Sequence, residues 1–278
     1  MNDEKYSESI KDAEVLITVR TYPLPLTSHG EVVCTAGILP DGSWVRIYPI
    51  RYRTDFNIKL RKWSIIKLDL KRKHKLVNKG DMRPESYVPI NDLQPENIVG
   101  YLSTDDKWRL RKEYVLSNVT NDLKKAIKKA HDNKQSLCTY KPATITNFTW
   151  EKTEPDWKKD WLSAWEQTDF FDQIDSKKMI KKLPYKFFYH FKDIDGSSHR
   201  LHIEDWEIGQ LFWNCLGSDR NEQIALQKVK QKYWNEFTEK DIHFFLGTTF
   251  QFHVRRIPNP YVIIGVFYPP IDEQLTIF

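Results

Sequence analysis

Short runs in which apolar and polar residues alternate fill the N-terminal third of the chain, a pattern typical of half-buried strands. These runs cover residues 15–22, 31–38, 43–50 and 63–72. Asp41 and Gly42 stand between the second and third runs, and an Asp-Gly pair in this position predicts a tight hairpin. Four short strands joined by tight turns predict a small barrel or a strongly bent sheet over the first ~100 residues.

Helical and strand-like patterns alternate in the rest of the chain. Leu123, Ile127 and Ala130 share one face of a helix predicted over 121–134, with lysines on the other faces. A second Asp-Gly pair, Asp195-Gly196, predicts another hairpin. The same patterns predict helices at 156–167, 205–216 and 219–237, and strands at 143–152, 241–249 and 261–269. The last two strands are almost continuously apolar, which is typical of central strands of a sheet.

The order of these elements predicts an α+β fold with a β-rich, small-barrel-like N-terminal unit. An α+β unit with two closing central strands follows it. The 278 residues suit one large domain or two smaller ones. We place a flexible N-terminus at 1–12, the β-rich unit at 13–118, a helical connecting region at 119–182 and the α+β unit at 183–278.

The amino-acid composition excludes some classes of function but does not identify a single one. A net charge of +5 favours a polyanionic partner, and ten tryptophans supply surfaces that pack or stack. Three cysteines without a CxxC pair argue against a disulfide framework and against a cysteine-rich zinc site. The chain has neither a signal-peptide core nor an apolar run of ~18 residues, so we expect a cytoplasmic protein with no membrane partner.

Cys34 is the candidate nucleophile of the sequence. It lies in EVVCTAGI, close to Glu31 and to the arginines of VRIYPIRYR. Guanidinium groups stabilise a neighbouring thiolate, which is the nucleophilic form of cysteine. The alternative is a cysteine of the core, because Cys34 alternates with Ala36 and Ile38 on one strand face.

An acidic cluster, Glu204, Asp205 and Glu207, opens the helix predicted at 205–216. A carboxylate at this position could serve as a general base or a metal ligand. The alternative is that these residues cap the helix and interact with its dipole. Imidazoles for a metal could come from His199, His202 and His253. Because no HxxxH spacing supports such a site, we expect no metal and no cofactor.

Arginines and aromatic residues mix in the segment SWVRIYPIRYR. Alternation places Trp44, Arg46 and Tyr48 on one strand face, where arginine could pair with phosphate and the rings could stack on bases. An ordinary solvated strand face is the alternative. Thr248 and His253 follow an apolar strand, a frequent place for a ligand. The candidate nucleic-acid-binding residues are Trp44, Arg46, Tyr48, Arg51, Arg53, Arg83, Thr248 and His253.

A stretch dense in lysine and arginine covers residues 59–79 and contains a single acid, Asp69. Such a stretch supplies sequence-independent affinity for a phosphate backbone when it gathers on one surface. A solvated run of charges is the equally open alternative.

Long strings of the sequence resemble a bacterial family associated with DNA-modification and phage-defence islands. The strings are RTYPLP, EVVCTAGILPDGSWVRIYPIRYR, HIEDWEIGQLFWNCL and KVKQKYWNEF with FFLGTT. Across almost the whole chain they are similar to a protein of the 7-deazaguanine DNA-modification cluster, which acts on 7-cyano-7-deazaguanine (preQ0) in DNA. The resemblance implies a nitrile hydratase-like enzyme that converts the base nitrile to an amide. Its implied partners are DNA and other proteins of the cluster.

Two chemical routes would serve that reaction. The Cys34 thiolate could add to the nitrile carbon to give a thioimidate that water resolves, with Glu31, Glu204 or Asp205 moving protons. A metal-activated water is the other route. A base within a duplex would first have to be flipped out.

Two functions without catalysis stay open. One is a reader of modified or single-stranded nucleic acid that uses the small barrel. The other is an interaction protein whose tryptophan-rich surface docks another subunit of a defence complex.

Overall fold

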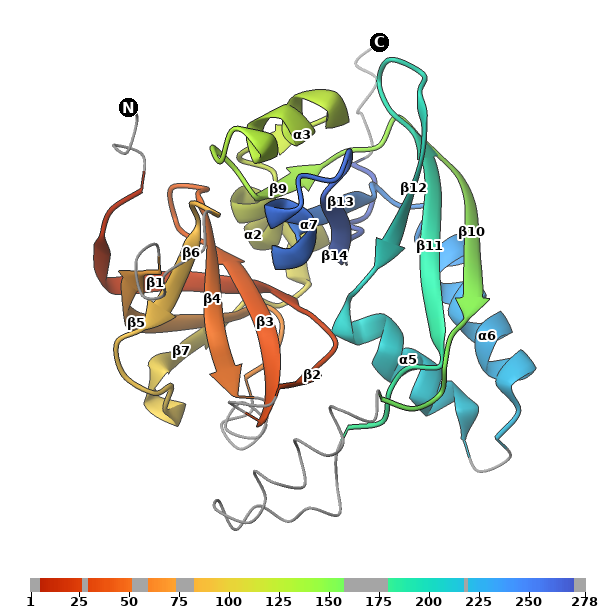
Figure 1. Ribbon diagram of the computed structural model, residues 1–278, viewed down its shortest axis with the longest axis horizontal. Coiled ribbons are helices and arrows are strands. Elements are labelled where there is room, and N and C mark those ends of the chain that lie inside the picture. The colour runs from red at the N-terminus through yellow and green to blue at the C-terminus, as the bar shows by residue number, and fades with distance from the viewer. Residues whose placement is uncertain are drawn as a thin grey trace.

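The structure is a computed structural model in which a barrel lies beside a mixed sheet with helices (Figure 1). It describes residues 6–26, 30–51, 60–73, 83–157, 180–217 and 220–272, without the side chains of 24–26, 30–32 and 51. Arg53 and nearly all of the helix predicted at 156–167 lie outside these residues. No helix within the described ranges is long and apolar enough to cross a membrane.

Five strands of the N-terminal unit close into a barrel. They are β1 (Ser9–Arg20), β3 (Gly30–Ile38), β4 (Trp44–Arg51), β5 (Ser64–Arg72) and β6 (Ser86–Pro89). β1 pairs with both β3 and β5, and β4 and β6 complete the ring. Only the β4–β6 pairing of this ring is parallel. If β1, β3, β4, β5 and β6 are numbered 1 to 5 in chain order, their order around the ring is 1-2-3-5-4. This is the order of an OB-type Greek-key barrel.

The interior of the barrel confirms the predicted alternation. Val15 and Ile17 of β1 point inward with Val45 and Ile47 of β4, and all four are buried. The predicted hairpin is also present, because the amide of Leu39 donates to the carbonyl of Ser43 (2.9 Å). Three short elements lie outside the ring: β2 (Leu24–Leu26), η1 (Pro95–Asn97) and β7 (Ile98–Tyr101).

The second unit is a seven-stranded mixed sheet in the order β10-β11-β12-β14-β13-β9-β8. In chain order its strands are β8 (Val119–Thr120), β9 (Leu137–Tyr140), β10 (Thr144–Lys152), β11 (Tyr185–Lys192), β12 (Ser198–Ile203), β13 (His243–Thr248) and β14 (Tyr261–Phe267). The helices are α2 (Asp105–Val115), α3 (Leu123–His131), α5 (Trp206–Leu216), α6 (Glu222–Lys230), the π-helical turn η3 (Gln231–Glu236) and α7 (Phe250–Val254). The α+β fold is therefore confirmed.

Both faces of the central strands are buried, which explains their continuous apolar character. Phe244 and Leu246 of β13 pack in the cluster that contains the buried faces of α3, α5 and α6. Phe245 lies in a second cluster, together with the outer face of the barrel. Its ring meets that of Trp44 edge to face, with centroids 5.3 Å apart. The helices α3, α5 and α6, the sheet and the barrel therefore form successive layers.

The region expected to connect the two units is part of the sheet. Residues 119–182 contribute β8, β9 and β10 in addition to α3. The four residues of β9 are all buried, and so short an apolar run has no readable period. At the other end of the chain, β1 begins at Ser9, inside the N-terminus expected to be flexible.

Candidate functional site

A pocket of about 470 Å³ opens where the barrel meets the helical part of the second unit. The barrel contributes Arg20 at the end of β1, Lys62 and Trp63 just before β5, and Tyr101 of β7. Residues of α5 and η3, together with Tyr268 after β14, complete the lining. Most of the lining side chains are aromatic or charged, and such side chains can stack on a planar ring or pair with a charged group.

Asp205 is the buried acid of this pocket. Its backbone is the N-cap of α5, and its Oδ1 atom accepts from the amide of Glu207 (3.1 Å), so the capping alternative is confirmed. The side chain is only 2% exposed. Within the part of the chain that the structure describes, no hydrogen bond reaches its Oδ2 atom. One oxygen of this carboxyl thus caps the helix, whereas the other is buried and faces the Lys62 ammonium.

Lys62 brings a cation from the barrel to that carboxyl. Its Nζ atom lies 3.7 Å from Asp205 Oδ2 and donates to Glu207 Oε2 at 2.7 Å. It also donates to the carbonyl of Val266 at 3.3 Å, and its side chain is 8% exposed. Trp63 beside it has a φ of 73°, a left-handed conformation that costs a bulky residue about 1–3 kcal/mol. Backbone strain of this kind is concentrated at functional sites.

The environment of the pair raises the pKa of both Asp205 and Lys62. Burial raises the pKa of Asp205 to about 7, although the nearby Lys62 ammonium acts in the opposite direction. Burial alone would lower the pKa of Lys62, but Asp205 and Glu207 outweigh it and raise that pKa above its usual value. The pocket therefore joins a carboxyl and an ammonium whose pKa values are both raised above their usual values.

Rings and cations surround this pair. The exposed Arg61 guanidinium lies over the ring of Tyr101, 4.1 Å from its centroid. Trp206 stacks on Tyr22, with ring centroids 5.5 Å apart and an interplanar angle of 27°. Such surfaces bind flat rings by stacking, and guanidinium groups pair with phosphate.

The strand face expected to meet nucleic acid is covered by the second unit. Trp44 is 6% exposed and Arg46 is 2% exposed, because this side of β4 packs on β13. Arg46 Nη1 donates to Ser136 Oγ at 2.9 Å, and its Nη2 atom donates to the carbonyl of Thr248 at 3.5 Å. The predicted surface position of Trp44 and Arg46 is therefore wrong. The alternation of residue types along a strand shows that its two faces differ, but it does not show what covers each face.

Four of the predicted binding residues do come together, but as a joint between the two units. Arg83 Nη1 donates to the same Thr248 carbonyl as Arg46, at 3.1 Å. The buried ring of His253 lies 3.3 Å from Thr248 Oγ1 and 2.8 Å from Asn133 Oδ1. These contacts link β4 and the start of β6 to the end of β13, and neither Thr248 nor His253 is exposed.

Cys34 is half-buried and lies outside the pocket lining. The pairing of β3 with β4 shifts between Val33 and Thr35, so Cys34 sits at a bulge and the strict alternation fails there. Its amide donates to Thr21 Oγ1 at 3.2 Å. Thr21 in turn bridges to Asp205 through the backbone. Cys34 is therefore linked to Asp205 only through Thr21, and it is not among the residues that line the pocket.

The other predicted residues are dispersed. Glu204 is half-buried with an oxygen 3.3 Å from His202 Nδ1. The ring of half-buried Tyr48 lies under Lys73, with Nζ 4.4 Å from its centroid. The side chains of Glu31 and Arg51 lie outside the described residues, as does the whole of Arg53.

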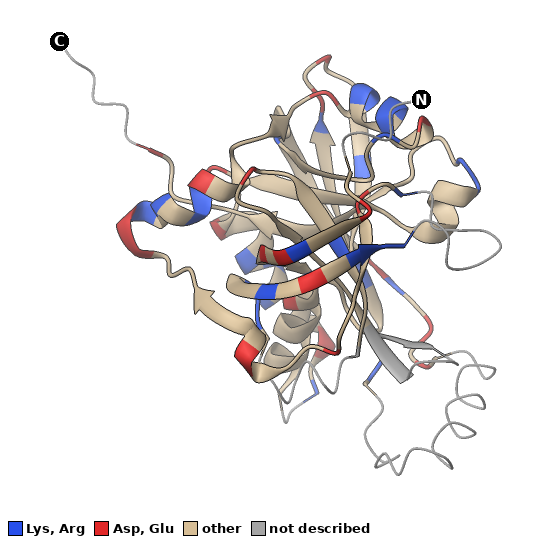
Figure 2. Cartoon of the chain, turned by 90° about the vertical axis from the view of Figure 1, so that its left-hand side faces the viewer, with Lys and Arg blue, Asp and Glu red and all other residues tan. Residues whose placement is uncertain are grey.

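The described part of the basic stretch is balanced by acids of the neighbouring strand. β1 pairs with β5 and sets Glu14 opposite Lys67, while Arg72 lies 4.0 Å from Glu8. Figure 2 shows blue and red positions interspersed along these two strands. This side of the barrel therefore lacks, in its described residues, the single-sign field of a phosphate-tracking surface.

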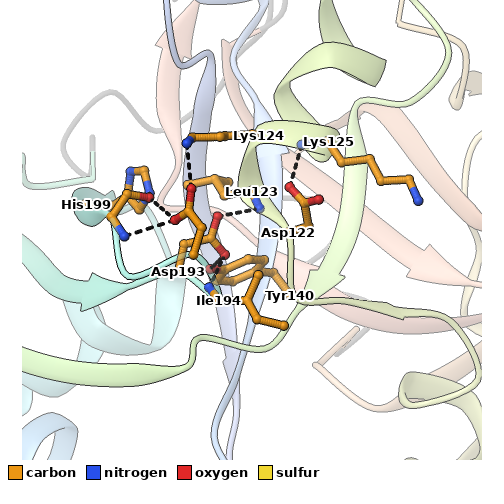
Figure 3. A network of polar contacts seen from close by, with 10 residues as sticks. Asp122, Leu123, Lys124, Lys125, Tyr140, Asp193, Ile194 and His199 are labelled. Carbon is orange, nitrogen blue, oxygen red and sulfur yellow. Dashed lines mark hydrogen bonds and ion pairs between the residues drawn. The ribbon is translucent and has the colours of Figure 1, made fainter.

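A second polar cluster, at the tip of the β11–β12 hairpin, is structural (Figure 3). The buried carboxylate of Asp193 accepts from the amide of Leu123 (2.9 Å), the hydroxyl of Tyr140 (2.8 Å) and the amide of Ile194 (2.8 Å). Both oxygens are thus occupied, and the cluster fastens the hairpin to α3. Across the described ranges, no three His, Cys, Asp or Glu side chains are grouped so as to hold a metal ion.

Most of the pocket was missed by the sequence analysis. Asp205 and Glu207 were identified because acids at a helix start are conspicuous. Lys62 was noted only as one member of a basic stretch, and Arg20, Trp63 and Trp206 carried no local signal. A lysine beside a tryptophan just before a strand is too common a pattern to identify a site.

Comparison with known families divides the chain where the structure does. A family model described as "Domain of unknown function (DUF8757)" matches residues 117–278, more than half of the chain. A second, "Domain of unknown function (DUF8758)", matches residues 11–117. The two matches meet between α2 and β8, where the barrel unit gives way to the sheet. No curated protein matches the sequence.

Proposed function

We propose that the pocket of this protein binds a nucleotide of DNA and performs acid–base chemistry on its base. The proposal starts from the pocket because the chain belongs to the family of the domain of unknown function DUF8757, whose description names no activity. The observation that carries this proposal is the buried Asp205 carboxyl, 3.7 Å from the Lys62 ammonium. A carboxyl with a pKa near 7 accepts and returns a proton at neutral pH. The surrounding rings suit a base, and the surrounding cations suit its phosphate.

The resemblance to DNA-modification proteins supports a more specific reaction, the hydration of 7-cyano-7-deazaguanine to its amide. A water oxygen bonds to the electrophilic nitrile carbon while the Asp205 carboxylate takes one of the water's protons. Asp205 then returns this proton to the nitrile nitrogen, and the resulting imidic acid tautomerises to the amide. Lys62 stays protonated and stabilises the negative charge that develops on nitrogen. The net change is the addition of one water.

This geometry favours the carboxylate over the thiolate route. A thioimidate requires the sulfur to reach the nitrile carbon, and Cys34 is not among the residues that line the pocket. Asp205 is among them. Cys34→Ala is therefore expected to keep turnover, whereas Asp205→Asn is expected to abolish it.

Mass spectrometry of nucleosides tests the reaction directly. DNA that carries 7-cyano-7-deazaguanine is incubated with the wild-type protein, Asp205→Asn, Cys34→Ala and the control Asp92→Asn, an exposed loop substitution. We expect the modified nucleoside to gain the mass of one water with all but Asp205→Asn. An unchanged nucleoside, in the presence of wild-type protein that binds this DNA, would refute hydration.

The strand order of the barrel favours a second candidate, a reader without catalysis. OB-type barrels bind oligonucleotides through the face of their second and third strands and the adjoining loops. Here those strands are β3 and β4, and Trp44 and Arg46 on β4 are covered by the sheet. A reader would therefore use the pocket between the units, and it would bind modified DNA with strong salt dependence but leave the base unchanged.

A further inference from the structure

A second pocket, of about 490 Å³, adjoins the first along α5. Trp206 and Gln210 line both pockets. These residues are four positions apart in one helix and so lie on the same face, one turn from each other. The two pockets therefore adjoin along this face of α5, with Trp206 at their boundary.

The second pocket has a built aromatic wall. Tyr22, which stacks on Trp206, accepts a hydrogen bond from Trp213 Nε1 at 2.8 Å. Its hydroxyl donates to the carbonyl of Lys181 at 2.7 Å. Gly209 makes room for this ring, because a Cβ atom there would lie 2.4 Å from Tyr22 Cδ2. Three rings are thus held in place before any ligand arrives.

Cations accompany the rings in the second pocket as they do in the first. Lys181 Nζ lies 5.6 Å from the ring centroid of Trp213, and the exposed Arg220 also lines the pocket. Rings that stack on successive bases, with cations that follow the backbone, are the recurring arrangement of single-strand binding sites. Each volume lies within the range of small-ligand pockets, so each is large enough for one nucleotide.

We infer that the two pockets form one groove for two successive nucleotides of a single strand, with Trp206 between their bases. The inference rests on the proposed function, because it identifies the substrate of the same site as a strand and not a free nucleotide. The base that reacts occupies the pocket of Asp205, and its neighbour stacks in the pocket of Tyr22 and Trp213. A target within a duplex is reached only after the strands separate locally.

Comparing a mononucleotide with the matching dinucleotide tests the inference. The probes are deoxyguanosine monophosphate and the dinucleotide of two deoxyguanosines that carries one terminal phosphate. The affinity for each probe is measured by the quenching of tryptophan fluorescence. Stacking of one further base is expected to make the dinucleotide bind about tenfold more tightly or better. Lys181→Glu and Arg220→Glu should bring the ratio of the two affinities close to one. Lys186→Glu, an exposed substitution on β11 outside both pockets, should preserve the ratio.

The outcomes separate this inference from the proposed function. Equal affinity of the wild-type protein for both probes would overturn the two-nucleotide groove and leave the nucleotide pocket standing. Failure of both probes to bind would overturn both proposals. A tenfold preference that Lys181→Glu and Arg220→Glu leave intact would also overturn the groove, because the second base would then bind elsewhere. Using a ratio guards against misfolding, since a loss of folded protein affects the titrations with both probes equally.

Discussion

Asp205→Asn is expected to remove a pH dependence of stability that the buried carboxyl gives the protein. Asparagine keeps the shape of the side chain and the oxygen that accepts from the Glu207 amide, and it is a good N-cap residue. Helix α5 therefore keeps its cap. In moderate acid the wild-type carboxyl is itself protonated, so neither side chain is charged and the two proteins differ little.

The magnitude follows from the difference in pKa between the folded and unfolded states. Burial raises the pKa of Asp205 from 3.8 to about 7, so over this interval the folded state holds a proton that the unfolded chain releases. The stability that comes from a raised pKa is fully present below the unfolded value, and it is lost as the pH rises through the folded value. Two pKa units at about 1.4 kcal/mol each give a loss of about 3 kcal/mol between about pH 5 and pH 8.

Urea unfolding of both proteins at about pH 5, 6, 7 and 8, followed by tryptophan fluorescence, measures this difference. From the lowest to the highest pH, the free energy of unfolding of Asp205→Asn should rise by about 3 kcal/mol relative to that of the wild type. Asp92→Asn, which removes an exposed carboxylate, should follow the wild type. If Asp205→Asn also follows the wild type, the carboxyl titrates normally and cannot be the acid–base group of the pocket.

Three further substitutions probe the site and its support. Lys62→Met should cost about 3 kcal/mol or more in urea unfolding at about pH 8, because it leaves a buried carboxylate without its counter-charge. Gly209→Ala gains up to about 1 kcal/mol of helix propensity but displaces Tyr22. The nucleotide affinity measured by titration should therefore fall, whereas the helix content measured by circular dichroism should not. Arg46→Ala should lower the free energy of unfolding by about 2 kcal/mol or more, and it should leave the affinity of the folded protein for single-stranded DNA unchanged. A loss of DNA affinity with unchanged stability would instead restore Arg46 to a binding surface.

Local patterns predicted the longer strands but neither α2 nor β9, and they did not identify the partners of the strands. Val45 and Ile47 fill the barrel as their alternation indicated, because a strand face of apolar residues has to be buried. The opposite face of β4 carries Trp44 and Arg46, and its mixed character suggested solvent or nucleic acid. It is buried because Phe245 packs on Trp44 and because Ser136 and Thr248 satisfy the guanidinium of Arg46. The continuous apolar run of β13 did indicate that both faces of β13 are buried. No feature of the β4 sequence indicated that β13 covers β4.

The same limit explains why local patterns missed most of the pocket. Asp205 was conspicuous because a helix cap has a local signature, whereas its cation lies 143 positions earlier in the chain, at Lys62. Lys62 reaches the carboxyl only because the outer face of the barrel packs on β13 and β14, and that packing buries both charges together. The raised pKa of Asp205 is thus a property of the joined units, since burial is its largest cause. A barrel separated from the sheet would expose Asp205 to water and return its pKa towards the ordinary range, so the raised pKa of this carboxyl requires the two units together.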